Sequence, residues 1–335
     1  MILATATKTE QQRRRPPLVA IVGPTAVGKT ATAIRLARDL DGEVVSADSR
    51  YLYRGMDIGT AKPSPAQMRG VPHHLIDILE PWQDYSLALY QRDAYRAIAD
   101  IAARGRLPIL AGGTPLYVNA VLEGWRIPEV PPDPAFRAAM AQLAREQGPE
   151  ALHRRLQAVD PAAAARIPAT NVRRVIRALE IHHHTGQRMT DLEGKSPPPY
   201  RILILGLALP RDELFRRIDE RVDEQIAAGL VEEVRRLLAA GVPPDAPAMS
   251  AIGYAELVPY LQGTTTLPEA IERIRFNTHR YARHQLTWLR RMRGVHWFDP
   301  RQPDAYAAML ERCRAFLATD ETTAGAAGVD QDGPR

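Results

Sequence analysis

Cysteine is nearly absent from this sequence, and that scarcity excludes two kinds of site. Cys313 is the only cysteine among 335 residues. One thiol cannot build a disulfide framework or supply the cysteine pairs of a zinc site. Long apolar runs are missing too, since none approaches the roughly 18 residues of a membrane-spanning helix. The amino-terminal segment has a basic cluster without the apolar stretch of a secretory signal. We therefore expect a soluble, cytoplasmic protein with no membrane partner.

Lysine is also scarce, so arginine carries most of the positive charge. The chain has 44 basic and 39 acidic residues, a net charge of +5, and only four of the basic residues are lysines. A planar guanidinium suits phosphates and stacked bases, although an arginine-rich genome would give the same bias. The arginines gather in two windows, 154–188 with a net charge of +5 and 273–293 with +7. Clustering of this kind is expected of a surface that meets a nucleic-acid backbone, with ordinary exposed helix faces as the alternative.

Aromatic residues make up only 6% of the chain, and three of them fall in the second arginine window. These are Phe276, Tyr281 and Trp288. At helical spacing, such residues are expected in a core rather than on a base-stacking surface.

Short apolar segments alternate with amphipathic helical patterns along much of the chain. The predicted strands are residues 18–22, 43–47, 107–111, 202–207 and 295–298. Strands separated by helices favour a parallel sheet with crossover helices. The predicted fold class is therefore α/β.

The pattern changes between the third and fourth of these strands. A proline-rich stretch at 127–134 leads into Ala/Arg-rich helical patterns, with no strand pattern among them. We predict an all-helical domain inserted at 125–198, within a core formed by 17–124 and 199–318. Residues 1–16 are expected to form a flexible lead and 319–335 a disordered tail.

A complete phosphate-binding motif follows the first predicted strand. The sequence GPTAVGKT fits G-x-x-x-x-G-K-[ST], with an amphipathic helical pattern after it. Backbone N–H groups of such a loop surround an anion, the lysine adds a positive charge, and the threonine hydroxyl is a Mg²⁺ ligand candidate. The motif specifies a polyphosphate without saying which one, and the residues predicted to bind it are Gly23, Pro24, Thr25, Ala26, Val27, Gly28, Lys29 and Thr30. The α/β core is accordingly expected to resemble the P-loop NTPases.

The acidic residue that normally accompanies this motif is missing. In ordinary P-loop NTPases a second strand ends in an aspartate that holds the Mg²⁺. The best candidate strand here, 107–111, leads directly into Gly112, Gly113 and Thr114 without an acid. A transferase that uses the loop for a leaving diphosphate is therefore favoured over an enzyme that hydrolyses nucleotides.

An aspartate follows the second predicted strand. Because the carboxyl ends of parallel strands open into one crevice, Asp48 should lie near the phosphate loop. There it would serve as a general base that faces the transferred group. The alternative is a turn or helix-capping aspartate without a chemical role.

From this point the motifs carry a family resemblance. The blocks GPTAVGKT, SADSRYLYRGMDIGTAKP, PHHLIDI and GGTPLY, followed by RVIRALE, RRIDERVDEQIAAGLVEEV, AIGYAE and QLTWLR, resemble the tRNA dimethylallyltransferase family in order and spacing. The resemblance covers about residues 17–300. It implies transfer of a dimethylallyl group from dimethylallyl diphosphate to N6 of adenine 37, beside the tRNA anticodon, with Mg²⁺ as cofactor.

The resemblance also implies roles for individual residues. Asp48 would be the general base, while Thr30 with Mg²⁺ and Arg221 would stabilise the departing diphosphate. From the sequence alone, a solvated helix with i,i+4 ion pairs is the better explanation of Arg221, and only the resemblance favours the catalytic role. The residues implied to bind tRNA, with Thr114 near the flipped base, are Asp48, Ser49, Arg50, Tyr51, Thr114, Arg137, Arg173, Arg174, Arg177, Ser250, Ala251, Ile252, Gly253 and Tyr254.

Two positions depart from the usual pattern of the family. Ala255 follows AIGY where a basic residue is usual, and Arg283-His284 stands where Lys-Arg is usual. Both departures concern single tRNA contacts rather than the chemistry.

Two other functions fit part of this pattern. A P-loop small-molecule kinase would suit the phosphate loop and a base after the second strand, but not the missing acid or the arginine windows. A non-catalytic RNA-binding protein would suit those windows, but not an intact Lys29, Thr30 and Asp48. The leading prediction is a monomeric prenyltransferase that binds the anticodon stem-loop and needs no obligate protein partner.

Overall fold

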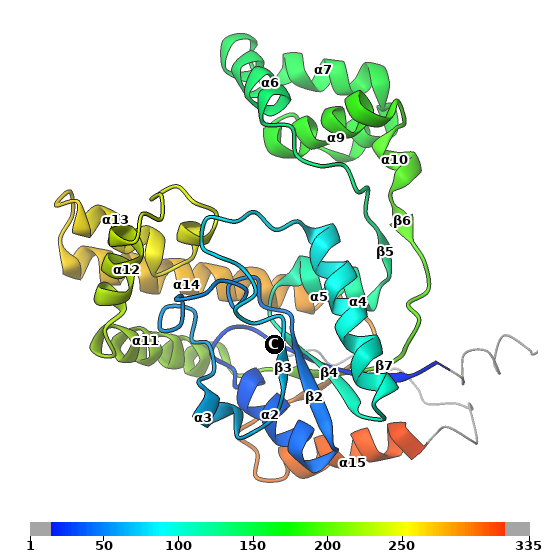
Figure 1. The fold of residues 1–335 in the computed structure, drawn as a ribbon, viewed down its shortest axis with the longest axis vertical. Coiled ribbons are helices and arrows are strands. Elements are labelled where there is room, and N and C mark those ends of the chain that lie inside the picture. Colours follow the sequence, from blue (N-terminus) through cyan, green and yellow to red (C-terminus); the bar gives the residue numbers. More distant parts are fainter. Residues whose placement is uncertain (1–14, 319–335) are drawn as a thin grey trace, which may run out of the picture. The chain divides into compact units, whose positions relative to one another are not determined.

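The computed structural model describes residues 15–318 as two compact units (Figure 1). Unit 1 ends at Val118 and resumes at Pro199, and unit 2 spans Asn119–Pro198. Most of the predicted lead, residues 1–14, and the predicted tail, 319–335, lie outside the described residues. Unit 2 begins earlier than the predicted insertion at 125, within a helix that joins the two units along the chain.

Unit 1 is built on a six-stranded parallel sheet in the order β3-β2-β4-β1-β7-β8. Its strands are β1 (Pro17–Val22), β2 (Gly42–Ser46), β3 (His73–His74), β4 (Leu107–Gly112), β7 (Arg201–Leu207) and β8 (Val295–Phe298). In the centre, Val19 of β1 is in register with Ile109 of β4 and Leu203 of β7. A strand covered on both faces needs a continuous apolar run, and β1 has one from Leu18 to Val22.

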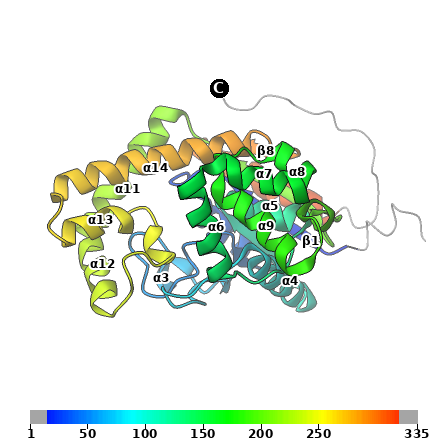
Figure 2. The ribbon, with the colours of Figure 1, turned by 90° about the horizontal axis from the view of Figure 1, so that it is seen from above.

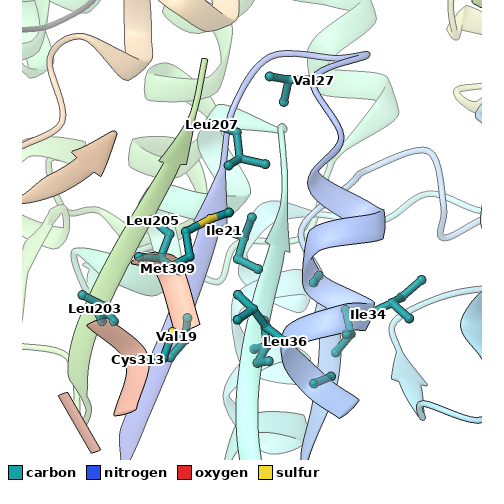
Figure 3. Packing of buried hydrophobic residues seen from close by; sticks show 14 of the residues in the cluster. Val19, Ile21, Val27, Ile34, Leu36, Leu203, Leu205, Leu207, Met309 and Cys313 are labelled. Atoms are coloured by element: carbon teal, nitrogen blue, oxygen red, sulfur yellow. The ribbon is translucent and has the colours of Figure 1, made fainter. Parts of the chain in front are cut away.

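The helices of unit 1 surround this sheet. They are α2 (Lys29–Asp39), α3 (Pro65–Met68), α4 (Leu87–Ala103), α5 (Pro115–Leu122), α11 (Arg211–Ala227), α12 (Leu230–Ala239), α13 (Tyr254–Leu261), α14 (Leu267–Leu289) and α15 (Ala305–Ala318), with a 3₁₀ turn at Ala248–Ser250. Figure 3 shows α2 and α15 on the sheet, where Leu36, Met309 and Cys313 pack with Val19 and Leu205. The single cysteine is therefore a core residue.

A group of four helices extends this core. The helices α11 and α13 pack along the long helix α14, and α12 connects them (Figure 2). The helix α13 begins at Tyr254, because Gly253 has a φ of 98° that ends the preceding turn.

Unit 2 consists mainly of helices. These are α6 (Pro134–Gln147), α7 (Pro149–Val159), α8 (Pro161–Arg166), α9 (Val172–Thr185) and α10 (Met189–Leu192). Three of them begin with proline, whose fixed φ and missing N–H suit the first helical position. An antiparallel ladder of β5 (Trp125–Arg126) and β6 (Gly194–Lys195) was not predicted, because two-residue strands leave no periodic pattern.

The predicted α/β class with a parallel core is confirmed, and each predicted strand lies within two residues of an observed one. Among residues 15–318, no helix is long and apolar enough to cross a bilayer.

Candidate active site

The phosphate loop connects β1 to α2, at the carboxyl end of the central strand. Gly28 immediately precedes α2 with a φ of 101°, a conformation that favours glycine. No side chain caps this helix, so the N–H groups of its first turn remain available to a ligand. The segment from Gly23 to Thr30 therefore has the open helix start that an anion requires.

Lys29 lies across this loop. Its Nζ donates a hydrogen bond to the carbonyl oxygen of Pro24 at 2.6 Å. Burial lowers the pKa of Lys29 to about 8; the Asp48 carboxylate opposes this shift and the Arg221 guanidinium adds to it. Lys29 is thus a cation near neutral pH that gains stability from an arriving anion.

Asp48 follows β2 and is close enough to Lys29 for their charges to interact. Its Oδ1 accepts a hydrogen bond from the Arg50 N–H at 2.9 Å. Burial raises the pKa of Asp48, and this effect exceeds the lowering by that hydrogen bond and by the charge of Lys29. A carboxylate that is desolvated and only partly hydrogen-bonded retains the capacity to accept a proton.

One cavity brings these groups together. It has a volume of about 1010 Å³ and is lined by Lys29, Thr30, Asp48, Tyr51 and Arg221, among others. Apolar side chains, including Ile34 and Ile58, share its wall. The cavity therefore offers an anion-binding end, a carboxylate and apolar surface within unit 1.

The loop after β4 approaches the Asp48 segment closely. A Cβ added at Gly112 would lie 2.2 Å from the carbonyl oxygen of Ala47, so only glycine fits there. Thr114 donates its N–H to the same oxygen at 3.1 Å, and its Oγ1 accepts the N–H of Ser49 at 3.0 Å. The structure thus brings the predicted residues Thr114, Ser49 and Asp48 to one place.

Gln285 joins this loop to the phosphate loop, a role that sequence reasoning did not find. Its Oε1 accepts the Thr25 N–H at 2.8 Å, and its Nε2 donates to the Gly113 carbonyl oxygen at 2.8 Å. The side chain is 2% exposed, so both bonds are shielded from water. It lies within the QLTWLR block, whose resemblance marked the segment without specifying this contact.

A second position missed from the sequence is Glu233 on α12. Its buried carboxylate accepts the N–H groups of Asp57, Ile58 and Gly59 at 2.9–3.1 Å. The Tyr254 hydroxyl donates to the same carboxylate. These bonds fix the loop that forms one wall of the cavity.

The predicted tRNA-binding block at 250–254 divides into two kinds of residue. Ser250 is exposed, and its Oγ accepts a hydrogen bond from Arg50 at 3.2 Å, which places this block beside the Asp48 segment. The Tyr254 side chain is fully buried, so its observed role is to hold the cavity loop through Glu233. Ala251 and Gly253 are buried as well, and Ile252 is half-buried.

The four arginines of unit 2 that were predicted to bind tRNA fall into two groups. Arg137 and Arg177 both hydrogen-bond the buried carboxylate of Glu180, at 2.6–2.8 Å. Arg173 and Arg174 are exposed on the first turn of α9. Two of the four therefore maintain the fold of unit 2, whatever else they contact.

The expectation that the aromatic residues of α14 are core residues is wrong for two of them. Phe276 is 60% exposed and Tyr281 is 37% exposed, while Trp288 is half-buried. The helix buries Ala270, Ile274 and Ala282 instead, because its apolar stripe is made of smaller side chains.

The side chains around the phosphate loop fit a magnesium ion held mainly by phosphate oxygens. Mg²⁺ binds through one or two protein oxygens together with substrate phosphates and water. Thr30 lines the cavity at the start of α2. Within residues 15–318, no group of three or more His, Cys, Asp or Glu side chains could hold a metal alone. A dedicated metal centre does not fit, whereas an ion shared with a diphosphate does.

Comparison with known sequences points to one family. The profile described as IPP transferase matches residues 51–292, and that described as isopentenyl transferase matches residues 16–77. A tRNA dimethylallyltransferase of Thermomicrobium roseum is 66% identical over 96% of this chain and 97% of its own length. Another, from Roseiflexus castenholzii, is 54% identical over 90% of this chain and 97% of its own length.

Solved structures agree with the sequence matches. The tRNA isopentenylpyrophosphate transferase of Bacillus halodurans is 44% identical, with a TM-score of 0.67 over 91% of this chain and 97% of that one. A eukaryotic dimethylallyltransferase, captured acting on tRNA, is 26% identical, with a TM-score of 0.77 over 90% of this chain and 80% of that one. This protein therefore belongs to the IPP transferase family, that of the tRNA dimethylallyltransferases.

Proposed function

We propose that this chain transfers a dimethylallyl group from dimethylallyl diphosphate to N6 of adenine 37 in tRNA. The observation that carries the proposal is the single cavity in which the phosphate loop and Asp48 face each other. The first would hold the leaving group and the second the attacking amine. Family membership supplies the class of reaction and of acceptor.

The chemistry assigned to the cavity is a substitution at the allylic carbon. The adenine N6 attacks the carbon bound to oxygen, the C–O bond to diphosphate breaks, and the N6 proton passes to the Asp48 carboxylate. An exocyclic amine is a weak nucleophile because its lone pair is delocalised, so a positioned base contributes about 10²- to 10⁴-fold. The raised pKa of Asp48 supports this role, since a more basic carboxylate accepts a proton more readily.

Negative charge grows on the diphosphate as the C–O bond breaks. The N–H groups at the start of α2, Lys29 and Arg221 are preorganised donors for that charge. Thr30 would hold Mg²⁺ together with the phosphate oxygens, and the ion, when bound, would neutralise part of the leaving charge. Gln285 would keep the loop in place during this step, through its bond to Thr25.

The substrate side of the proposal concerns tRNA. Arg50, Ser250 and Thr114 lie near Asp48, where they would contact nucleotides beside the reacting adenine. The adenine must leave the anticodon-loop stack to enter the cavity, a step that costs a few kcal/mol or less in a single-stranded loop. We further infer that the enzyme acts as a monomer in the cytoplasm, where its tRNA substrates are found.

A transfer assay tests the proposal directly. Purified protein, unmodified tRNA and dimethylallyl diphosphate labelled in the allyl group are combined with Mg²⁺ and without ATP. Label should appear in tRNA at adenine 37, and chelation of Mg²⁺ should reduce the rate. Absence of transfer, together with ATP-dependent phosphorylation of a metabolite, would instead identify a P-loop kinase.

A further inference from the structure

A buried carboxylate on α12 holds the backbone of the loop that follows Tyr53. Glu233 is 2% exposed, and its oxygens accept the N–H groups of Asp57, Ile58 and Gly59 at 2.9–3.1 Å. The Tyr254 hydroxyl donates a fourth hydrogen bond to it. None of these four partners is a basic side chain, so dipoles aimed from the loop and from α13 satisfy the buried carboxylate.

The same loop is held from a second helix. Nε2 of Gln225, on α11, donates to the carbonyl oxygens of Ile58 and Gly59 at 2.7 and 2.9 Å. A Cβ added at Gly59 would lie 2.5 Å from Cε2 of the Tyr254 ring, so the loop packs directly against that ring. We call Glu233, Tyr254 and Gln225 the loop clamp. Residues 57–59 belong to no helix or strand, and the clamp binds their backbone instead.

The clamped loop provides one side of an apolar part of the active-site cavity. Ile58 and Ala61 line the cavity from the loop, and Ala31 and Ile34 line it from α2. Ala31 follows Thr30 directly, so this apolar part begins beside the end of the cavity that would bind the diphosphate. The allyl group is the apolar part of the donor and is attached to that diphosphate. We call the space between Ile34, Ile58 and Ala61 the apolar slot.

The size of the whole cavity does not select one donor. Its volume of about 1010 Å³ matches that of pockets which bind drug-sized molecules, so a longer allylic chain is not excluded by volume. The position of α2 is set by its packing on the sheet through Leu36 and Ala37. The opposite side of the slot is an irregular loop, so the spacing of the two sides depends on the clamp.

We propose that Glu233, with Tyr254 and Gln225, is a positioning residue that sets the width of the apolar slot and thereby favours a five-carbon donor over longer allylic diphosphates. This inference rests on the proposed function, because it takes an allylic diphosphate as the donor. Glu233 does not line the cavity, so it acts through the backbone of residues 57–59.

The test compares kcat/KM for dimethylallyl and geranyl diphosphate in transfer to tRNA. Glu233→Gln keeps the size of the side chain but turns an amide NH₂ towards backbone donors, so hydrogen bonds to the loop are lost. The preference for dimethylallyl diphosphate should fall about tenfold or more, and the KM for tRNA should be unchanged. Ile58→Ala widens the slot while leaving the clamp intact, and should shift the preference in the same direction.

The neighbouring residue provides a matched control. Glu232 is exposed and pairs only with Arg235 on its own helix, so Glu232→Gln makes the same chemical change without touching the loop. It should leave the donor preference and the melting temperature at their wild-type values. Tyr254→Phe removes one of the four hydrogen bonds to Glu233 and should reduce the preference less than Glu233→Gln does.

The outcomes separate this inference from the proposed function. A wild-type protein that transfers no label refutes the proposed function. An active wild type that uses geranyl diphosphate as well as dimethylallyl diphosphate refutes the inference alone, and so do Glu233→Gln and Ile58→Ala variants that keep the wild-type preference. A Glu233→Gln variant that loses kcat/KM equally for both donors and melts earlier would show a purely structural role, which also overturns it. If Glu233→Gln does not fold, the same ratio measured in Tyr254→Phe and Ile58→Ala decides.

Discussion

Asp48 in unit 1 and Glu180 in unit 2 are each carboxylates near two basic side chains, but their proton affinities shift in opposite directions. Asp48 interacts with Lys29 and with the backbone and charge of Arg50, yet burial raises its pKa. Glu180 is fully buried, and its oxygens accept bonds from Arg137, Arg177 and the Asp133 N–H. Those bonds exceed the cost of burial and lower its pKa to about 2.

The difference is one of direct bonding rather than of nearby charge. Cations that face a carboxylate without bonding it leave a lone pair for a substrate proton, whereas guanidinium groups that bond it directly hold the ionised form. A basic neighbourhood therefore does not distinguish a reactive carboxylate from a structural one. The number of direct hydrogen bonds does.

The largest expected effect comes from replacing each carboxylate with its amide. Asp48→Asn should lower kcat about 10²- to 10⁴-fold, because the amide cannot take the N6 proton. Its stability should be equal or slightly higher, because an unfavourably buried charge is removed. Single-turnover transfer and urea unfolding measure the two quantities. Full activity in Asp48→Asn would remove the general base from the mechanism.

Glu180→Gln should show the opposite behaviour. Arg137 and Arg177 would lose their ionised partner, which should cost about 1.5–3 kcal/mol of unfolding free energy. Hydrogen exchange should report the loss in α6 and α9, while kcat at saturating tRNA stays near the wild-type value. A variant with unchanged stability would show that Glu180 is not the anchor we describe.

The pH dependence of donor use should depend on Lys29. Its pKa is lowered to about 8, so the protonated form, which attracts diphosphate, is lost as the pH rises through that value. The kcat/KM for the allylic diphosphate should therefore fall about tenfold per pH unit well above 8. Lys29→Arg retains its charge at high pH, so its kcat/KM should begin to fall at a higher pH than that of the wild type. If kcat/KM fell at the same pH in both proteins, a group other than Lys29 would be responsible.

A smaller effect is expected in acid. The folded pKa of Glu180, about 2, lies below the ordinary value of 4.5, so its ionised form stabilises the fold above pH 4.5. That contribution is lost as the pH falls from about 4.5 towards 2. The stability difference between wild type and Glu180→Gln should therefore shrink over this range. A difference that stays constant between pH 6 and pH 3 would contradict the ion-pair assignment.

The sequence alone was sufficient to predict the parallel-sheet core. Five of the six sheet strands could be placed from short, mainly apolar runs, and the clearest of these is β1, which is buried on both faces and apolar throughout. Asp48 could be placed near Lys29 because parallel strands end at one edge. These inferences depend on local patterns, which a single sequence records.

The missed residues depend on long-range contacts. Glu232 and Glu233 are adjacent in a charged run, but Glu232 is exposed while Glu233 is buried and holds the cavity loop. Gln285 bonds Thr25, 260 positions away in the chain. Phe276 was expected in the core because its helical spacing is compatible with a buried position. The same spacing also fits the exposed side of the helix, and packing decides which side is buried.

The position of the insertion has a consequence for synthesis of the chain. The central strand β1 pairs with β4 on one side and with β7 on the other, and unit 2 is encoded between those two strands. At ribosomal speeds of about 5–20 residues per second, roughly 5–20 s separate the emergence of β4 from that of β7. During that interval β1 has an unpaired edge while unit 2 is being synthesised, and unit 2 is complete only when β7 begins to emerge. The nascent sheet is therefore most open to misassembly or chaperone capture just before residue 207 leaves the ribosome.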